Sequence, residues 1–333
     1  MELSESSRQR VISAAAIVLA LLGLLAIFLK RGQILQALSA ADWRLVPVAL
    51  LFAALSYSFM SYGFVVVNRL FGILMRRREL FAIGFVSQVL NHVLSSGGAA
   101  GYSLRFLLIQ KQGYAIRDIV AASLVHFYVT SLGMLALLPF GLFYLFLRRP
   151  AAQATTTAIG IAGLLVVAAF IFATVLVFGR SVRQRVLRLA SRLWNRVTHR
   201  HIEEPLSNFD SAMSRGVAAF RRHPDQLAVL ALMVTADWSF SLVTLWFCFD
   251  ALGEPLKLGV LITGFSIGIT AGVLSMVPGG LGVQEGSMAG IYTLLGVPLE
   301  QAVLAAILFR VVYYFIPYLV SLVFYRRLLR GSS

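Results

Sequence analysis

The sequence predicts an all-α fold, a polytopic membrane helix bundle that forms one integral membrane domain over residues 1–333. Apolar residues make up 59% of the chain and charged residues only 13%, and the mean hydropathy is +0.83, which excludes a soluble globular protein. Several apolar runs approach or exceed the roughly 20 residues that a helix needs to cross the hydrocarbon core. Two glycine-rich stretches also interrupt apolar segments at corresponding places in the two halves, which points to a transport site near the membrane midplane.

Six uninterrupted spans are expected from the apolar runs. They lie at about residues 11–29, 45–67, 118–147, 158–178, 226–249 and 302–325. The first run is longer than the apolar core of a signal peptide and lacks a clear cleavage site, so we expect a retained helix. The third run is long enough to tilt strongly or to extend past the bilayer, and Pro139 could kink it.

Two further segments, at about residues 80–111 and 258–297, are broken by the glycine-rich stretches. Each half is too short to cross a bilayer comfortably, so we interpret them as re-entrant hairpins that enter from opposite sides. Each break is followed by a glycine, Gly113 or Gly296, and then by valine and alanine at the same spacing. The halves would thus form an inverted repeat, with repeat one at about 45–178 and repeat two at about 226–325. If each broken segment instead makes two full crossings, the chain has about ten spans.

Between the repeats lies a basic connector at about 180–225. Arginines and apolar residues both recur at helical spacing over about 180–200, which predicts an amphipathic helix on an anionic lipid surface. A solvated connector is the alternative. Further basic clusters lie at 76–78 and 326–330, and the formal net charge is +15. Because basic loops favour the cytoplasm, we expect a multi-pass protein of the cytoplasmic (inner) membrane with both termini cytoplasmic. Five basic residues fall on the outer side in this arrangement: Lys30, Arg31, Arg44, Arg148 and Arg149.

Motifs typical of catalysis or of metal binding are not found. The sequence has no phosphate-binding loop, no His-Glu-x-x-His run and no Cys/His spacing that suits a metal. His199 and His201 lie close to Glu203 and Glu204, but so loose a loop cluster is typical of solvated side chains. The single cysteine, Cys248, excludes a disulfide within the chain. We therefore expect no metal, no cofactor, no nucleic-acid partner and no enzymatic activity, with a membrane-embedded lipid transferase as the alternative.

The two glycine-rich breaks are the first part of the candidate site. Non-helical backbone at membrane depth is tolerated only where it is buried in protein or lines a wet cavity. Glycine permits tight turns and leaves backbone groups close to a ligand. The half-helices that begin near Tyr102 and Gly286 would direct their positive dipole ends inward, towards a phosphate or a carboxylate. The alternative is that these glycines only let helices pack closely.

Charged side chains within the membrane are expensive and mark the second part of the site. We expect Arg105 and Arg310 to hold a lipid phosphate, and Glu285 to pair with Arg310 when the site is empty or to meet a cationic headgroup. Asp237 would partner an arginine or help carry a proton, and His126 would titrate near neutral pH and couple transport to protons. A structural ion pair, a core histidine and a partly solvated aspartate are the respective alternatives.

The predicted substrate-binding set combines both parts. It consists of Gly97, Gly98, Gly101, Arg105, Pro278, Gly279, Gly280, Gly282, Gln284, Glu285, Arg310 and Tyr313. The candidates for proton coupling are His126 and Asp237.

At these residues the chain resembles a known family. The run Pro-Gly-Gly-x-Gly-x-x-Glu within residues 277–286, together with the helix of Arg310, is similar to the membrane region of lysylphosphatidylglycerol synthase/flippase proteins. Residues 91–105 and 209–224 fit the same pattern, and the resemblance covers about 10–325. The resemblance implies lipid translocation between leaflets, in the best-known members of an aminoacylated phosphatidylglycerol.

The bifunctional members of that family continue into further spans and a soluble aminoacyl-transfer domain, whereas this chain stops at Ser333. We therefore expect that it does not make lysyl-lipid itself. The open substrate classes are an aminoacyl lipid, a cardiolipin-like phospholipid, a polyprenyl-linked sugar and a hopanoid. Besides a flippase-like lipid translocase, the sequence allows a small-solute secondary transporter or a non-transporting membrane partner of a lipid-synthesis enzyme.

Overall fold

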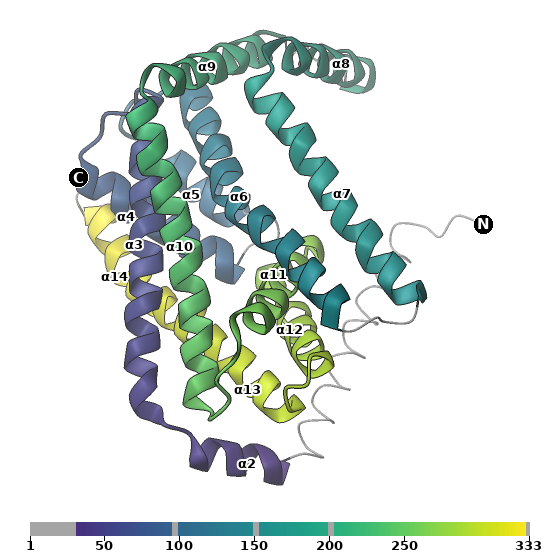
Figure 1. Ribbon diagram of the computed structural model, residues 1–333. Coiled ribbons are helices and arrows are strands. Elements are labelled where there is room, and N and C mark those ends of the chain that lie inside the picture. The colour runs from purple at the N-terminus through teal and green to yellow at the C-terminus, as the bar shows by residue number, and fades with distance from the viewer. Residues whose placement is uncertain (1–30, 95–98, 149–152, 199–202, 331–333) are drawn as a thin grey trace.

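The computed structural model describes residues 31–94, 99–148, 153–198 and 203–330 (Figure 1). Within these ranges every regular element is helical. The longer elements are α2 (Arg31–Ala40), α3 (Val46–Leu70), α4 (Arg77–Leu94), α5 (Ala99–Gln110), α6 (Ile116–Arg148), α7 (Gln153–Phe178), α8 (Arg180–Thr198), α9 (Glu203–Arg222), α10 (Pro224–Ala251), α11 (Leu258–Leu274), α12 (Val283–Leu294), α13 (Leu299–Arg310) and α14 (Ile316–Arg330). Short helices occupy Trp43–Leu45, Pro278–Gly280 and Val311–Phe315.

Four stretches of the described chain are long and apolar enough to cross a membrane. They are Trp43–Leu70, Ile116–Arg148, Pro224–Ala251 and Leu299–Leu329. The bent pair Gly163–Phe178 and Arg180–Arg196 is a candidate for a fifth span. These five overlap the predicted spans from the second to the sixth, and the predicted first span at 11–29 lies outside the described residues. The all-α polytopic membrane bundle is confirmed.

The outer surfaces of the long helices are apolar. On α6, Phe127, Phe140 and Phe143 are exposed, and on α7 so are Leu164 and Leu165. So much exposed apolar surface suits lipid and not water. The helix α6 also runs unbroken past Pro139, so this proline does not end the span.

The two broken segments form helical hairpins, α4–α5 and α11–α12. The shorter arms, α5 and α12, have 12 residues each. At 1.5 Å per residue such an arm is about 18 Å long, well short of the roughly 30 Å hydrocarbon core. Arms of this length favour re-entrant hairpins over two full crossings.

The ends of the first hairpin lie at the α9 end of the bundle. The ring of Phe71, which follows α3, packs against Gly216 of α9. Asp118, at the start of α6, accepts a hydrogen bond of 2.7 Å from Arg215 of α9. Since α3 leads into the hairpin and α6 leads out of it, both ends of α4–α5 lie beside α9.

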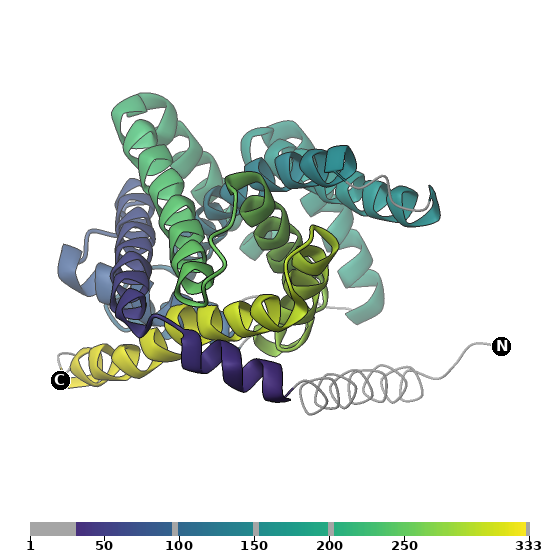
Figure 2. The same ribbon diagram turned by 60° about the horizontal axis from the view of Figure 1, so that its bottom comes forward.

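The ends of the second hairpin lie at the opposite end of the bundle, near α2. The amide of Asp42 donates to the carbonyl of Ala251 at the end of α10, over 2.8 Å. The helix that follows the hairpin, α13, packs beside α2, as Figure 2 shows with that end of the molecule brought forward. The two hairpins therefore enter the bundle from opposite ends.

The three basic regions of the sequence gather at the α9 end. Arg77 and Arg327 line one cavity there, so the loop before α4 and the end of α14 are neighbours. The predicted connector helix is present as α8, but residues 203–222 form a second amphipathic helix, α9, that we did not predict. The single connector helix of the sequence interpretation is thus corrected to two helices.

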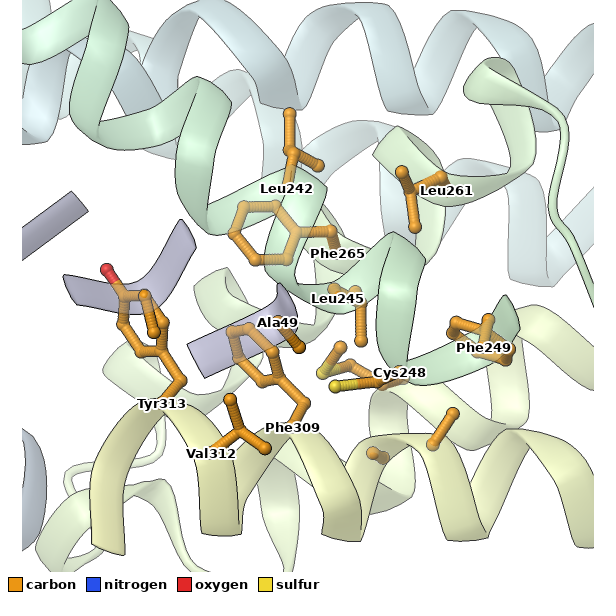
Figure 3. Packing of buried hydrophobic residues seen from close by; sticks show 14 of the residues in the cluster. Ala49, Leu242, Leu245, Cys248, Phe249, Leu261, Phe265, Phe309, Val312 and Tyr313 are labelled. Carbon is orange, nitrogen blue, oxygen red and sulfur yellow. The ribbon is translucent and has the colours of Figure 1, made fainter. Parts of the chain in front are cut away.

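The core is built where α3 and α10 pack side by side and α11 and α13 close over them. Figure 3 shows Leu245, Cys248, Phe265 and Phe309 in this cluster, each almost fully buried. The ring of Tyr313 stacks on Phe309 with centroids 5.0 Å apart. Apolar packing therefore holds the helix of Arg310 against α10 and α3.

A polar junction joins α7, α8 and α9. The guanidinium of Arg183 donates to Asp210 over 2.6 Å, to Ser214 over 2.7 Å and to the carbonyls of Leu176 and Val177. Arg183 is only 5% exposed, unlike most arginines of α8, so it serves the junction and not a lipid surface.

Burial alone would raise the pKa of Asp210, but hydrogen bonds from Gln184 and Arg183, and the charges of Arg183 and Arg180, outweigh it and lower the pKa below the ordinary 3.8. A carboxylate with a lowered pKa contributes stability above its ordinary pKa, and loses it as the pH falls through the lower folded value. We expect the midpoint of thermal unfolding in detergent to fall for the native chain as the pH drops below about 3.8. Above that pH the free energy of unfolding of the variant Asp210→Asn should be lower than that of the native chain by about 1.5–3 kcal/mol. Below it, the stability of the variant should depend less on pH. Equal pH dependence of the two proteins would contradict this role.

Candidate functional site

The tip of the second hairpin meets the last turn of α4, in the first hairpin, inside the bundle. The second tip turns at Gly279, whose backbone is left-handed with φ +61°. A Cβ placed on Gly279 would lie 2.8 Å from the carbonyl oxygen of His92 and 3.1 Å from that of Val93, both in the last turn of α4. Only glycine satisfies both the backbone angle and this close approach. The Gly-Gly run thus brings hairpins from opposite ends of the bundle into backbone contact.

An ion pair between Arg310 and Glu285 closes the second tip. The Nε and Nη2 atoms of Arg310 contact Oε1 of Glu285, and both Nη atoms donate to the carbonyl of Gly279 over 3.1 Å. The other carboxylate oxygen, Oε2, accepts from the amide of Gly282 over 2.8 Å. The two charged side chains are 18% and 17% exposed, so a ligand can reach them. The structure shows the predicted pairing, and it also shows that Glu285 occupies the positive N-terminus of α12.

The helix changes its winding directly after Arg310. Residues Val311–Phe315 form a π-helical turn, which carries Tyr313 and Tyr314. Such turns are rare and occur frequently at functional sites. The guanidinium of Arg310 lies over the ring of Tyr314 at 5.0 Å, and the hydroxyl of Tyr314 exchanges hydrogen bonds with Gln284 over 3.1–3.2 Å. The π turn therefore places an aromatic and polar surface beside the ion pair.

Arg105 lies on the first hairpin and is 1% exposed. Its Nε donates to Ser87 over 2.7 Å and its Nη2 to Gln88 over 3.3 Å, and its guanidinium lies 4.6 Å from the ring centre of Phe64. Its Nη1 has no hydrogen-bond partner among the described residues. Within the described part of the chain Arg105 forms no ion pair. A buried cation without a counterion is costly, so this group is unusual and calls for a functional account.

An unbroken chain of hydrogen bonds leads from Arg105 towards the Arg310 helix. Gln88 accepts from Arg105 and contacts Nε2 of His92 over 3.3 Å, and Nδ1 of His92 lies 2.8 Å from the hydroxyl of Tyr57. Tyr57 donates to the carbonyl of Tyr313 over 2.9 Å. Because that hydroxyl has one proton, a neutral His92 must carry its own proton on Nδ1 and accept from Gln88 on Nε2.

Asp237 reaches the same helix from α10. Ser56 donates to its carboxylate over 2.5 Å and lies 2.6 Å from the hydroxyl of Tyr313, which must then donate to Ser56. Asp237 is 6% exposed and pairs with no arginine in the described chain. The alternative of a partly solvated Asp237 is therefore excluded, and the expected arginine partner is not found among the described residues.

The structure places the other predicted residues as follows. His126 is buried against the ring of Phe64, with Nε2 3.5 Å from the carbonyl of Met60, and it contacts neither Glu285 nor Arg310. Gly101 packs against α4, and its amide donates to Asn91 over 2.8 Å. Pro278, Gly280 and Gly282 belong to the second tip. Gly97 and Gly98 lie outside the described residues, as do His199 and His201.

Two details of the sequence interpretation are corrected here. The half-helices begin three residues earlier than expected, at Ala99 and Val283. Over the described residues the expected chamber between the hairpins is not open: Ser56, Tyr57 and Tyr313 are at most 5% exposed, and Ser56 and Tyr57 both hydrogen-bond to Tyr313. These residues form a closed polar centre, beside which Gln88, His92 and the ion pair are partly accessible.

Sequence reasoning missed Ser56 and Tyr57 of α3. Serine and tyrosine are ordinary in membrane helices, so neither stood out in an apolar run. A weak signal was available, since these two polar side chains are adjacent near the middle of the span at 45–67. Among the described residues, no group of three or more His, Cys, Asp or Glu side chains is placed to hold a metal ion.

Comparison with known proteins gives the context of this geometry. The family described as the lysylphosphatidylglycerol synthase TM region matches residues 11–321. The chain belongs to this family. It is similar to a UPF0104 membrane protein of Methanothermobacter thermautotrophicus, with 25% identity over 304 residues that cover 88% of this chain and 85% of that protein.

A shorter match links the chain to a second kind of protein. It is 30% identical over 92 residues to a phosphatidylglycerol lysyltransferase of Staphylococcus aureus strain COL, which covers 28% of this chain and 11% of that protein. Membership of the lysylphosphatidylglycerol synthase TM region family establishes a multi-pass membrane protein with a role connected to membrane lipids.

Proposed function

We propose that this protein is a flippase-like lipid translocase, which moves a phospholipid or a related polar lipid between the leaflets of the membrane. The observation that carries the proposal is the contact between the tip of the second hairpin and the last turn of α4 in the first, beside the Arg310–Glu285 pair, where the hairpins come from opposite ends of the bundle. Broken helices that meet at mid-bilayer between two halves of a chain are the usual setting of a transport site.

The first step is binding of the lipid phosphate at Arg310. Its guanidinium is already oriented by the carbonyl of Gly279, and Glu285 is the carboxylate that neutralises it within the described part of the chain. A phosphate presents the same paired oxygens as a carboxylate and matches the planar guanidinium fork. An incoming phosphate would therefore displace Glu285, while a cationic group on the same headgroup would meet the released carboxylate.

The second step is a change of access from one leaflet to the other. In the proposed mechanism the two hairpins act as the halves of an inverted repeat, and each would open towards the end from which it enters. Arg105 supplies a second phosphate ligand on the first hairpin, since its Nη1 is unsatisfied in the closed state. The lipid tails would stay in the membrane while the headgroup passes between the tips.

Coupling to protons would use Asp237. Its carboxylate is linked through Ser56 to the hydroxyl of Tyr313, three residues beyond Arg310. Protonation of Asp237 would break or reverse these hydrogen bonds and so act on the helix that holds the phosphate ligand. His126 lies farther from this network and is the second candidate.

The proposal also includes an orientation in the membrane and the partners of the chain. The basic end of the bundle, with α8 and α9, would face the cytoplasm and place both termini there. The exposed arginines of α8 would lie on anionic lipid. The chain itself would not be an enzyme, and a lipid-synthesis enzyme would supply its substrate.

The decisive experiment is a leaflet-exposure assay. Purified protein is reconstituted into vesicles that carry a labelled phospholipid in the inner leaflet, and a membrane-impermeant quencher reports the lipid that reaches the outside. We expect movement of labelled lipid with the native chain and none in vesicles without protein. Separate arms with phosphatidylglycerol, its lysyl ester, cardiolipin and a polyprenyl-linked sugar would select the substrate class.

Two outcomes would overturn the proposal. Uptake of a small solute without lipid movement would favour a secondary transporter. Absence of both activities, with a lipid-synthesis enzyme recovered in a stable complex, would favour a non-transporting partner.

A further inference from the structure

A cavity of about 550 Å³ lies at the α9 end of the bundle, away from the hairpin tips. It is bounded by the base of the first hairpin and by the last turns of α14, which lie side by side in Figure 1. Ala82, Ile83 and Leu108 form a buried apolar floor. A cavity of this volume is in the range of sites that hold a small organic molecule or part of a lipid.

The rim of this cavity is strongly basic. Arg77, Arg78, Lys111 and Arg327 line it, with Glu79 as the one carboxylate among the lining residues. The four cations come from three separate elements of the chain and are all exposed. None of them forms an ion pair within the ranges that the structure describes. Their charge is therefore available to an external anion.

A second hollow of about 420 Å³ extends the cavity on its polar side. It shares Met75, Glu79 and Gln112 with the first and adds Arg76 and Tyr114. The apolar wall of the first cavity, in contrast, continues along α14 with Phe324 and Leu328. One long site thus has a basic, hydrogen-bonding end and an apolar end.

We propose that this site binds one phospholipid with an anionic headgroup. Its phosphate would lie among Arg78, Lys111 and Arg327, and an acyl chain would cover Phe324 and Leu328. Charge complementarity selects the occupant, because four unpaired cations around an apolar floor suit an acidic lipid and neither a zwitterionic lipid nor an apolar helix.

The position of this site suggests a role in the proposed lipid translocation. This role, unlike lipid binding itself, rests on the proposed function. The site abuts the base of the hairpin that carries Arg105, at the end where that hairpin enters the bundle. A lipid bound there lies beside the first hairpin, from which it would move to the site at Arg310. Binding itself does not depend on translocation.

The test is lipid binding to the purified full chain, measured by native mass spectrometry in detergent. The probes are dioleoyl phosphatidylglycerol and dioleoyl phosphatidylcholine. We expect phosphatidylglycerol to bind the native chain at least tenfold more tightly. In the triple variant Arg78→Gln, Lys111→Gln, Arg327→Gln, phosphatidylglycerol affinity should fall about 100-fold, at roughly fivefold for each basic side chain near a lipid surface.

A matched control removes the same charge elsewhere. The variant Arg221→Gln, Arg222→Gln, Arg326→Gln alters three exposed arginines that do not line the cavity, and it should bind phosphatidylglycerol as the native chain does. A second variant, Leu328→Trp, keeps every charge and narrows the apolar end, and it should lose at least tenfold in affinity. Thermal unfolding in detergent verifies that each variant is folded.

Equal affinity of the cavity triple variant and the native chain would overturn the proposal. So would an equal loss in the control triple variant, which would show a general effect of surface charge. If the native chain binds phosphatidylglycerol as expected but moves no lipid in vesicles, the result would count against the proposed function alone.

Discussion

The variant Arg310→Gln is expected to lose lipid movement in reconstituted vesicles by on the order of 100-fold. The guanidinium of Arg310 is held by the carbonyl of Gly279 and by Glu285, and it is the partly accessible cation at the point where the hairpins meet. Charge-assisted hydrogen bonds contribute about 1.5–3 kcal/mol each, so loss of the phosphate ligand removes most of the binding energy. Arg310→Lys should be only partly active, since an ammonium cannot form the paired contacts of a guanidinium.

Glu285→Gln should also abolish lipid movement. Combined with Arg310→Gln, it distinguishes a functional ion pair from a purely structural one. If the ion pair were purely structural, each single variant would lose stability because it leaves the partner charge unpaired, and the double variant Arg310→Gln, Glu285→Gln would regain both stability and activity. We expect the double variant to regain thermal stability in detergent and to remain inactive in vesicles. Full lipid movement in either single variant, with insertion shown by expression and purification, would refute the assigned role.

Much of the fold could be predicted from the sequence because its signals are local. Apolar run length and the glycine breaks located the helices and hairpins, and the charge of Arg310 and Glu285 marked the ion pair. The second connector helix, α9, was missed because the arginine repetition that marked α8 ends near residue 200, although residues 203–222 also show the amphipathic pattern of a helix.

The centre of the site could be predicted only in part, because it depends on which helices meet. Nothing local to Ser56 or Tyr57 shows that α3 lies against α10 and the π turn, where these hydroxyls bridge Asp237 and Tyr313. Equally, His126 follows Gly113 at nearly the spacing at which Arg310 follows Gly296, but its contacts lie with Phe64 and Met60. Spacing along the sequence indicated equivalent positions in the two halves, but it could not show which side chains pack against each residue.

Gly279→Ala is the second substitution for which we expect a large effect. An alanine there must adopt a left-handed backbone, which costs about 1–2 kcal/mol, and its methyl group would lie 2.8 Å from the carbonyl oxygen of His92. That oxygen is backbone in the last turn of α4 and cannot move aside alone. The hairpin tips would therefore separate, and the carbonyl that orients Arg310 would shift with them. We expect lipid movement to fall by at least tenfold, with a lower midpoint of thermal unfolding.

Gly282→Ala is the matched control for this prediction. Gly282 also has a left-handed backbone, with φ +78°, and it lies three residues away in the same turn, but a Cβ on it would meet no atom within 4 Å. The two variants share the backbone cost and differ in the contact with the first hairpin. If that contact matters for transport, Gly279→Ala loses far more activity than Gly282→Ala at similar expression. Equal loss in the two variants would show that only the flexibility of the turn is needed, and the meeting of the tips would then have no role in moving a lipid.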